Sequence, residues 1–182
     1  MSNKKEWTLQ KLEDILKENF PPEVRFKFHT EGQCHVCKEQ DWGDPTAYAR
    51  NREVSAAIEL GHEVAKTFDG PDAYNQNGDP VEYKSTTGAR MSMSYTGISV
   101  QPTWLQQEKY LKEQKILPYT EHYANRFESG RLVESWVLPG QAVYDLLLPK
   151  IRKSWEKKNR KDPRISASLS QKEIKFYGTR VI

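Results

Sequence analysis

Two carboxylic acids and a lysine near the middle of the chain have the types and the spacing of residues that act together on a substrate. Asp72 follows a proline, and nine residues separate it from Glu82, which opens a Glu-x-Lys sequence ending at Lys84. Because side chains alternate along a strand, Glu82 and Lys84 are expected on one face and Tyr83 on the other. The intervening Asn-Gly pair predicts a hairpin turn that places Asp72 beside them.

This combination suits metal-assisted hydrolysis of a phosphodiester. The Asp72 and Glu82 carboxylates would bind Mg²⁺, a hard cation that prefers oxygen ligands, and Mn²⁺ is expected to substitute. Lys84 could orient the attacking water or stabilise negative charge that builds on the phosphate. Two further acids, Asp69 and Glu53, are candidate ligands of the metal. We therefore predict Asp72, Glu82 and Lys84 as catalytic residues.

The alternative is that these side chains form a surface ion-pair cluster without catalytic function. An acid and a Glu-x-Lys sequence arise readily in a chain of which 29% is charged. The proline before Asp72, the Asn-Gly turn and the flanking apolar residues nevertheless all agree with a hairpin. An inward-facing Glu-x-Lys pair otherwise violates the alternation of a strand, which favours the catalytic interpretation.

The surrounding sequence predicts an α/β fold with a central mixed sheet flanked by helices. Helical spacing of apolar residues indicates a helix over 8–19, stopped by Pro21-Pro22, and a second over about 45–66 on which Glu53 faces inward. Further segments are predicted as helices over 106–114 and 144–160, strands over 121–138 around a Gly turn, and a final strand over 173–181. We predict a single domain over 1–182, with a mainly helical region over 1–66 and a catalytic core over 67–182, the site lying at one edge of the sheet where the hairpin bends.

A basic stretch near the C-terminus could contact a polyanion. The net charge of +3 and the pI of about 8.7 are weak evidence by themselves, but residues 150–164 carry eight Lys and Arg against two acids. Contact with phosphates and a solvated helix face both stay open. Arg164 could grip a guanine and Asp162 could accept from cytosine, with Lys161, Ser166 and Ser168 completing a DNA-binding set; local pairing of Asp162 with Arg164 is the alternative. Residues 90–96 are a second candidate for groove contacts, although their methionines are more often core.

The two cysteines, Cys34 and Cys37, form a CxxC sequence in a stretch that we expect to be a loop. A structural zinc site needs four ligands, and the chain has no second CxxC. A redox CxxC would need a strand before it and a helix directly after it. Zinc at Cys34 and Cys37 is therefore not expected, and two reduced thiols are predicted.

The composition and the N-terminal sequence indicate where in the cell the protein is expected. Hydrophobic residues make up 36% of the chain and the mean hydropathy is −0.85, which leaves no room for a membrane span. The N-terminus lacks the apolar stretch of a secretory signal. A cytoplasmic protein without a membrane partner is expected.

The chain resembles the PD-(D/E)XK nucleases and, within them, the PvuII-like type II restriction endonucleases. The run Asp72-Ala73, a turn with glycine and Glu82-Tyr83-Lys84-Ser85 is similar to the active-site hairpin of that group, with the same number of residues between the two acids, and Asp69 matches an additional acidic position. The hairpin over 123–138, the basic helix around Trp155 and the ending over 161–181 are similar in order and spacing.

The resemblance implies a Mg²⁺-dependent homodimer that cuts double-stranded DNA at a specific, palindromic site, since a two-fold protein matches a two-fold sequence. The N-terminal stretch with the CxxC sequence has no counterpart in the group. The histidines with which that group reads bases have no equivalent near residues 91–104 of this chain. The DNA sequence that it recognises should therefore differ from theirs. Two alternatives stay open: a structure-selective or repair nuclease, such as a junction resolvase, and a non-catalytic DNA-binding module.

Overall fold

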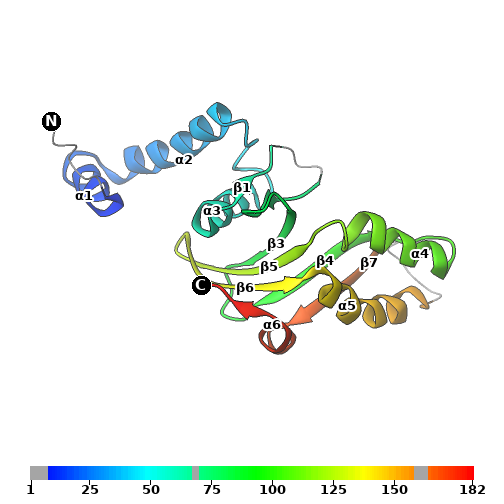
Figure 1. The fold of residues 1–182 in the computed structure, drawn as a ribbon. Coiled ribbons are helices and arrows are strands. Elements are labelled where there is room, and N and C mark those ends of the chain that lie inside the picture. The colour runs from blue at the N-terminus through cyan, green and yellow to red at the C-terminus, as the bar shows by residue number, and fades with distance from the viewer. Residues whose placement is uncertain (1–7, 67–69, 158–163) are drawn as a thin grey trace.

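The computed structural model describes residues 8–66, 70–157 and 164–182. Its centre is a six-stranded sheet of order β1-β2-β3-β5-β6-β8, in which β3 and β5 are parallel and the other neighbours are antiparallel (Figure 1). Its strands are β1 (Glu63–Val64), β2 (Ala73–Tyr74), β3 (Pro80–Thr86), β5 (Glu121–Glu128), β6 (Arg131–Pro139) and β8 (Thr179–Arg180). A second, antiparallel sheet pairs β4 (Ser92–Ser99) with β7 (Arg164–Ser170). The prediction of an α/β fold with a mixed central sheet is confirmed, as are the hairpins at residues 73–86 and 121–139.

Two hydrophobic clusters cover the two faces of the central sheet. Side chains alternate along β5, so Tyr123 belongs to the cluster that contains helix α3 (Arg50–Leu60) and Ala124 to the one that contains helix α5 (Gly140–Trp155). The β4–β7 sheet packs on the α5 side, where Leu147 and Leu169 are fully buried. Complete burial of such a side chain stabilises the fold by about 1.5–3 kcal/mol. The strands between the clusters are therefore fixed on both faces.

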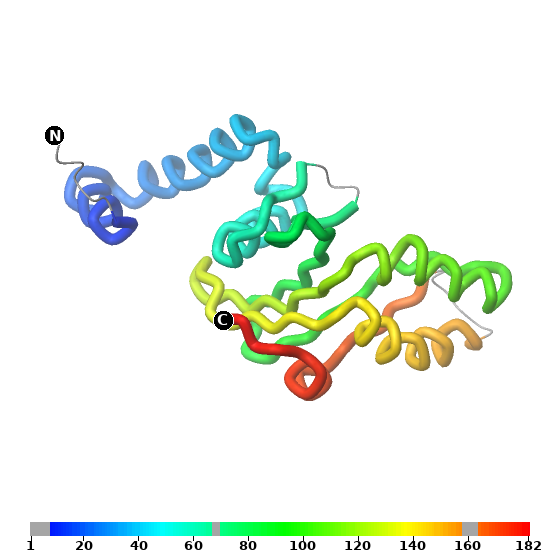
Figure 2. The backbone as a smooth tube through the Cα atoms, in the orientation of Figure 1, coloured from blue at the N-terminus to red at the C-terminus, as the bar shows by residue number. Residues whose placement is uncertain are grey.

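Two N-terminal helices form an arm that projects away from the central sheet (Figures 1 and 2). Helix α1 (Leu9–Asn19) begins after Thr8, whose hydroxyl accepts a hydrogen bond from the Lys11 N–H at 3.2 Å, as the sequence predicted. Helix α2 (Pro22–Glu39) begins with a proline, a residue favoured at the first helical position. No residue of α1 is buried.

The loop predicted around the two cysteines is wrong, because both lie inside α2. Gly32 suggested a loop, but an isolated glycine costs a helix only about 1 kcal/mol. Pro22 fixes the start of this helix, and the chain leaves it only at Gln40, before Asp41 takes a left-handed backbone conformation (φ 59°). The helical region is therefore longer than the sequence pattern indicated.

The second predicted helix, over about 45–66, is shorter than expected. The Asp44 carboxylate accepts a hydrogen bond from the Thr46 N–H at 2.8 Å and holds a turn in place of a first helical turn. Helix α3 starts at Arg50 and ends at Leu60, because Gly61 adopts a left-handed conformation (φ 68°) that ends a helix. The following residues enter β1 instead.

The final strand predicted over 173–181 is wrong for most of its length. Residues Gln171–Tyr177 form helix α6, and only Thr179–Arg180 pair with β6. Ser170 and Glu173 form a reciprocal capping box at the start of this helix. The helix predicted over 106–114 begins as α4 (Trp104–Tyr110) and continues as a π-helix, η1 (Leu111–Lys115).

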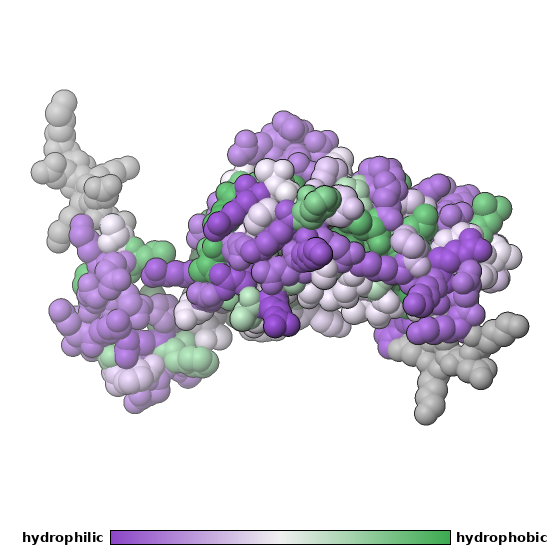
Figure 3. All heavy atoms as spheres, turned by 90° about the horizontal axis from the view of Figure 1, so that it is seen from below, coloured by the Kyte–Doolittle hydropathy of each residue, from purple (hydrophilic) through white to green (hydrophobic). Residues whose placement is uncertain are grey.

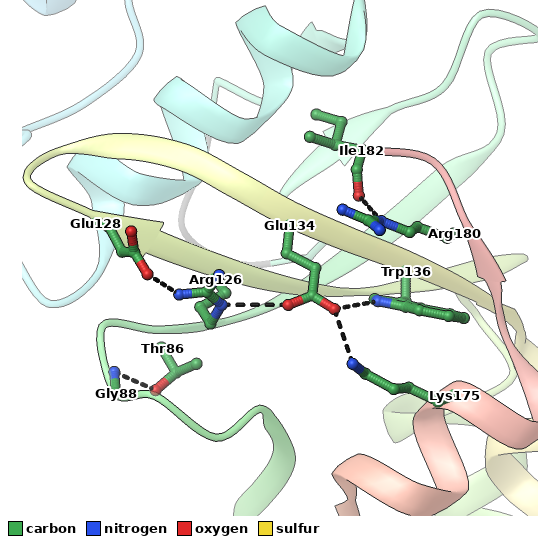
Figure 4. Close-up of polar contacts among 9 residues, drawn as sticks. All are labelled: Thr86, Gly88, Arg126, Glu128, Glu134, Trp136, Lys175, Arg180 and Ile182. Atoms are coloured by element: carbon green, nitrogen blue, oxygen red, sulfur yellow. Dashed lines mark hydrogen bonds and ion pairs between the residues drawn. The ribbon is translucent and has the colours of Figure 1, made fainter.

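A polar network joins the outer side of the β5–β6 hairpin to α6 (Figure 4). The Glu134 carboxylate accepts a hydrogen bond from Trp136 Nε1 at 2.9 Å and forms ion pairs with Arg126 and Lys175, both at 3.2 Å. The Trp136 hydrogen bond and these two cations lower the pKa of Glu134. Because its oxygens already have these partners, this carboxylate belongs to the scaffold.

The viewed surface is largely polar, with apolar side chains gathered in places that include the arm (Figure 3). Leu9, Phe26 and Phe28 of the arm and Ile58 of α3 are each more than half exposed. Within the part of the chain that the structure describes, no helix has the length and apolar character needed to cross a membrane.

Candidate active site

Asp72 lies at the end of a short ladder in the central sheet, the one between β2 and β3. It directly precedes β2, which pairs with β3 only through Ala73 and Tyr74, so the ladder stops beside Val81. The next inward N–H of β3, that of Tyr83, has no strand partner on this side and donates instead to Asp72 Oδ2 at 2.6 Å. A backbone group that needs an acceptor thus fixes the Asp72 carboxylate against β3.

Glu82 and Lys84 lie on the same face of β3 and form an ion pair. Their side chains are 16% and 22% exposed. Tyr83 lies on the opposite face, where it is buried and its hydroxyl is 2.7 Å from His62 Nδ1. The period of the strand therefore separates the charged pair from the aromatic core, as the sequence predicted.

The raised pKa of Asp72 indicates that it is buried and that other carboxylates lie near it. Burial is the largest cause that raises the pKa of Asp72, followed by the charges of Glu82 and Glu53, and together they bring it to about 8. Lys84 and the Tyr83 N–H oppose this shift. Glu53 thus belongs to the same charged neighbourhood, although it lies on α3 and forms an ion pair with Arg50 at 3.3 Å. The structure brings Asp72, Glu82, Lys84 and Glu53 together from three elements.

The arginine beside Glu53 explains how α3 is held against the site. Arg50 is 1% exposed. Its guanidinium donates to the carbonyl of Trp42 at 2.6 Å and to the carbonyl of Ala65. These bonds join α3 to the segments before and after it. They therefore fix the position of the helix from which the Glu53 side chain extends.

Sequence reasoning missed the opposite wall of the site, a cavity of about 120 Å³ lined by Glu82 and Lys84 on β3 and by Tyr95, Lys115 and Tyr119. The Lys84 ammonium lies 5.1 Å from the centre of the Tyr95 ring. This is within the range of a cation–π contact. No local pattern pairs Lys84 with Tyr95, because the contact depends on how β4 folds back over β3.

Tyr95 is fixed by a buried histidine. The Tyr95 hydroxyl is 2.8 Å from His122 Nδ1, and His122 Nε2 is 3.0 Å from the carbonyl oxygen of Ile116. Burial lowers the pKa of His122 to about 4, so the imidazole is neutral at pH 7. With one proton, Nε2–H donates to Ile116 and Nδ1 accepts from Tyr95.

Of the predicted DNA-binding residues, Arg164, Ser166 and Ser168 share the exposed face of β7. Strand β4 lies antiparallel beside it and contributes further hydroxyls to the same face, and Ser94 Oγ is 3.1 Å from Ser168 Oγ. The two segments predicted separately for groove contacts therefore form one ribbon. Its methionines, Met91 and Met93, are core residues, as expected.

Three predicted site residues, Asp69, Lys161 and Asp162, lie outside the described residues. Within the described ranges, no group of three or more His, Cys, Asp or Glu side chains is arranged to hold a metal ion. Cys34 and Cys37 are free thiols, and burial is the main cause that raises the pKa of Cys37.

The comparisons with known proteins add no assignment. A scan against protein-family models finds no match, and a search of curated proteins finds no sequence similar to this chain.

Proposed function

We propose that this protein is a Mg²⁺-dependent endonuclease of the PD-(D/E)XK type that hydrolyses phosphodiester bonds in double-stranded DNA. The observation that carries the proposal is the Asp72 carboxylate bound to the backbone of β3 between Glu82 and Lys84, where burial first and then the charges of Glu82 and Glu53 raise the pKa of Asp72 to about 8. Acids held together at this cost in stability fit a site that takes up a cation.

The donor set fits Mg²⁺, which is commonly bound through one or two carboxylates and keeps several waters. Asp72 and Glu82 would hold the ion, with Glu53 and Asp69 as further candidates. When bound, the ion would acidify a water and offset phosphate charge. Glu82 would then exchange the Lys84 ammonium for the cation, which frees Lys84 to orient the water or to stabilise negative charge on the phosphate.

The β4–β7 ribbon supports site-specific cleavage. A two-stranded ribbon fits the major groove of B-form DNA. Ser94 belongs both to the ribbon face and to the lining of the cavity beside Glu82 and Lys84. This proximity favours a type II restriction endonuclease, in which base contacts and cleavage lie together, and a cytoplasmic location remains the expectation.

A homodimer is part of the proposal, because two copies related by a two-fold axis can cut both strands of a palindrome. The arm supports it. Leu9, Phe26 and Phe28 are 83%, 72% and 59% exposed, and a helix of 11 residues with none buried is marginal on its own. A second copy covering the arm would bury these side chains, and sedimentation equilibrium would detect it as a doubled mass.

Two alternatives use the same residues differently. A structure-selective or repair nuclease, such as a resolvase, would keep Asp72, Glu82 and Lys84 without reading bases. A non-catalytic DNA-binding module would keep them as an ion-pair cluster. The ribbon of hydroxyls beside the cavity favours the restriction endonuclease over both.

The test is incubation of plasmid and phage DNA with the purified protein in Mg²⁺ or Mn²⁺, beside Asp72→Ala and Lys84→Ala. Lys175→Ala is a matched control, because Lys175 also pairs with a glutamate on a strand but lies outside the cavity. Discrete fragments that both site variants lose and the control retains would support the proposal. Smears or cutting of branched DNA alone would favour the repair nuclease, and DNA binding without cleavage would favour the non-catalytic module.

A further inference from the structure

The cavity beside the candidate catalytic residues carries a second lysine whose charge the fold leaves unused. Lys115 lines it together with Glu82 and Lys84. Lys84 is paired with Glu82, whereas no carboxylate in the described part of the chain lies within ion-pair distance of Lys115. Two lysines and a single carboxylic acid side chain therefore line one small space.

The backbone that carries Lys115 is unusual. Helix α4 widens into the π-helix η1, in which the Ile116 N–H donates to the Leu111 carbonyl at 2.9 Å, five residues back. In an α-helix, residues five apart point in directions about 140° apart, yet Leu111 and Ile116 are both fully buried. The wider turn brings both into the core and leaves Lys115 at the rim of the cavity. Such π-turns are rare and frequently occur at functional sites.

The same turn is tied to Lys84. The carbonyl of Ile116, the residue after Lys115, accepts from His122, which in turn holds the Tyr95 hydroxyl. The Tyr95 ring lies against the Lys84 ammonium. A chain of contacts through His122 and Tyr95 therefore links the backbone beside Lys115 to the Lys84 ammonium.

We propose that Lys115 binds the scissile phosphate of the DNA, together with Lys84, across this cavity. The volume of about 120 Å³ is small for a ligand pocket and suits a phosphodiester group rather than a base or a larger ligand. Two cations and the Thr96 side chain around this space match the charge and the acceptor oxygens of a phosphate. The inference rests on the proposed function, since it names the substrate group that this site takes.

The experiment measures DNA affinity in EDTA, where hydrolysis does not proceed, as a function of salt. Each phosphate contact contributes about 0.9 to the slope of log K against log salt. Lys115→Ala should lower the slope by about that amount and weaken binding about tenfold at low salt, while Lys115→Arg should keep both. Lys109→Ala is the matched control, because Lys109 is exposed on the preceding helix and pairs with Glu113 at 4.0 Å outside the cavity.

Cleavage in Mg²⁺ supplies the second measurement. A lysine on the scissile phosphate predicts a kcat about tenfold or more lower in Lys115→Ala and unchanged in Lys109→Ala. If the wild type cuts DNA and Lys115→Ala matches it in both slope and kcat, the inference is overturned and the proposed function stands. If the wild type neither binds nor cuts DNA, the proposed function itself fails.

Discussion

Replacing Asp72 by asparagine should stabilise the metal-free protein at neutral pH while abolishing cleavage. Burial together with the charges of Glu82 and Glu53 raises the pKa of Asp72 from 3.8 to about 8. In the wild type, the Tyr83 nitrogen donates to Asp72 Oδ2 at 2.6 Å. The amide oxygen of an asparagine can accept the same hydrogen bond. The substitution therefore removes the charge and keeps the contact that positions the side chain.

The magnitude follows from the proton that the folded state holds. Between about pH 4 and pH 8 the folded protein keeps a proton on Asp72 that the unfolded chain has released, so stability falls as the pH rises through this window. One pKa unit corresponds to about 1.4 kcal/mol. The shift from 3.8 to about 8 thus sets an upper limit of roughly 6 kcal/mol, all of it lost by about pH 8. The stability of the Asp72→Asn variant should not show this fall with rising pH.

Urea unfolding followed by tryptophan fluorescence in EDTA, from about pH 5 to about pH 8, measures the effect. Asp145→Asn is the control, since Asp145 is exposed on α5 and, among the residues that the structure describes, accepts a hydrogen bond only from Gln141 in the same helix. The free energies of unfolding of wild type and Asp72→Asn should diverge by a few kcal/mol as the pH rises. Mg²⁺ should narrow the gap by stabilising only the wild type. Parallel pH curves for the two proteins would refute the reasoning.

Three further substitutions test the scaffold, each by urea unfolding at pH 7. Gly140→Ala should destabilise the fold by about 2 kcal/mol or more, because a Cβ there would overlap the Tyr119 carbonyl oxygen; a stability within 0.5 kcal/mol of wild type, roughly the range of surface changes, would contradict the packing. Leu147→Ala should cost about 2–5 kcal/mol, since Leu147 is fully buried, and a smaller loss would mean that the α5 core relaxes. Glu134→Gln should cost about 1–3 kcal/mol, because its partly buried bonds to Arg126 and Lys175 lose their charge, and should leave cleavage unchanged; lost cleavage would place Glu134 in the site.

The local features of the site could be predicted because they depend on neighbouring residues. The alternation of β3 places Glu82 and Lys84 on one face, and the Asn-Gly turn returns the chain beside Asp72. Both follow from a period of two and from the turn that a glycine with positive φ permits, here Gly78 at 82°. The helix start at Thr8 followed from its capping side chain in the same way.

Errors arose where several local signals competed. Gly32 suggests a loop yet lies inside the continuous helix α2, and Gly61, which the apolar pattern includes in a helix, ends α3. The capping pair Ser170 and Glu173 was present in the sequence and indicated the start of α6, but the apolar spacing after it suggested a strand. At the end of α3 and the start of α6, the glycine and the capping pair indicate the helix boundary more directly than the apolar periodicity does.

The second wall of the site could not be predicted, because it depends on contacts between distant segments. His122 meets Tyr95 from 27 residues away, and Ser94 meets Ser168 from 74 residues away. Neither pair has a spacing that a local period would reveal. The position of Lys115 depends in addition on a π-turn. That turn is needed because Leu111 and Ile116 are both buried, and this burial is known only from the folded structure.

The fold holds the Asp72 carboxylate close to the backbone of Glu82. Strand β3 pairs in register with β5 from Val81 to Thr86, and Tyr83 anchors it in the core on one face through His62. Asp72 is bound to the backbone of the same strand. Moving the backbone of Glu82 away from Asp72 would therefore break hydrogen bonds of the parallel ladder or expose a buried tyrosine, and each of these costs free energy. A carboxyl fixed in this position keeps a proton at neutral pH, as its pKa of about 8 indicates, and a cation bound under the proposed function would take the place of that proton.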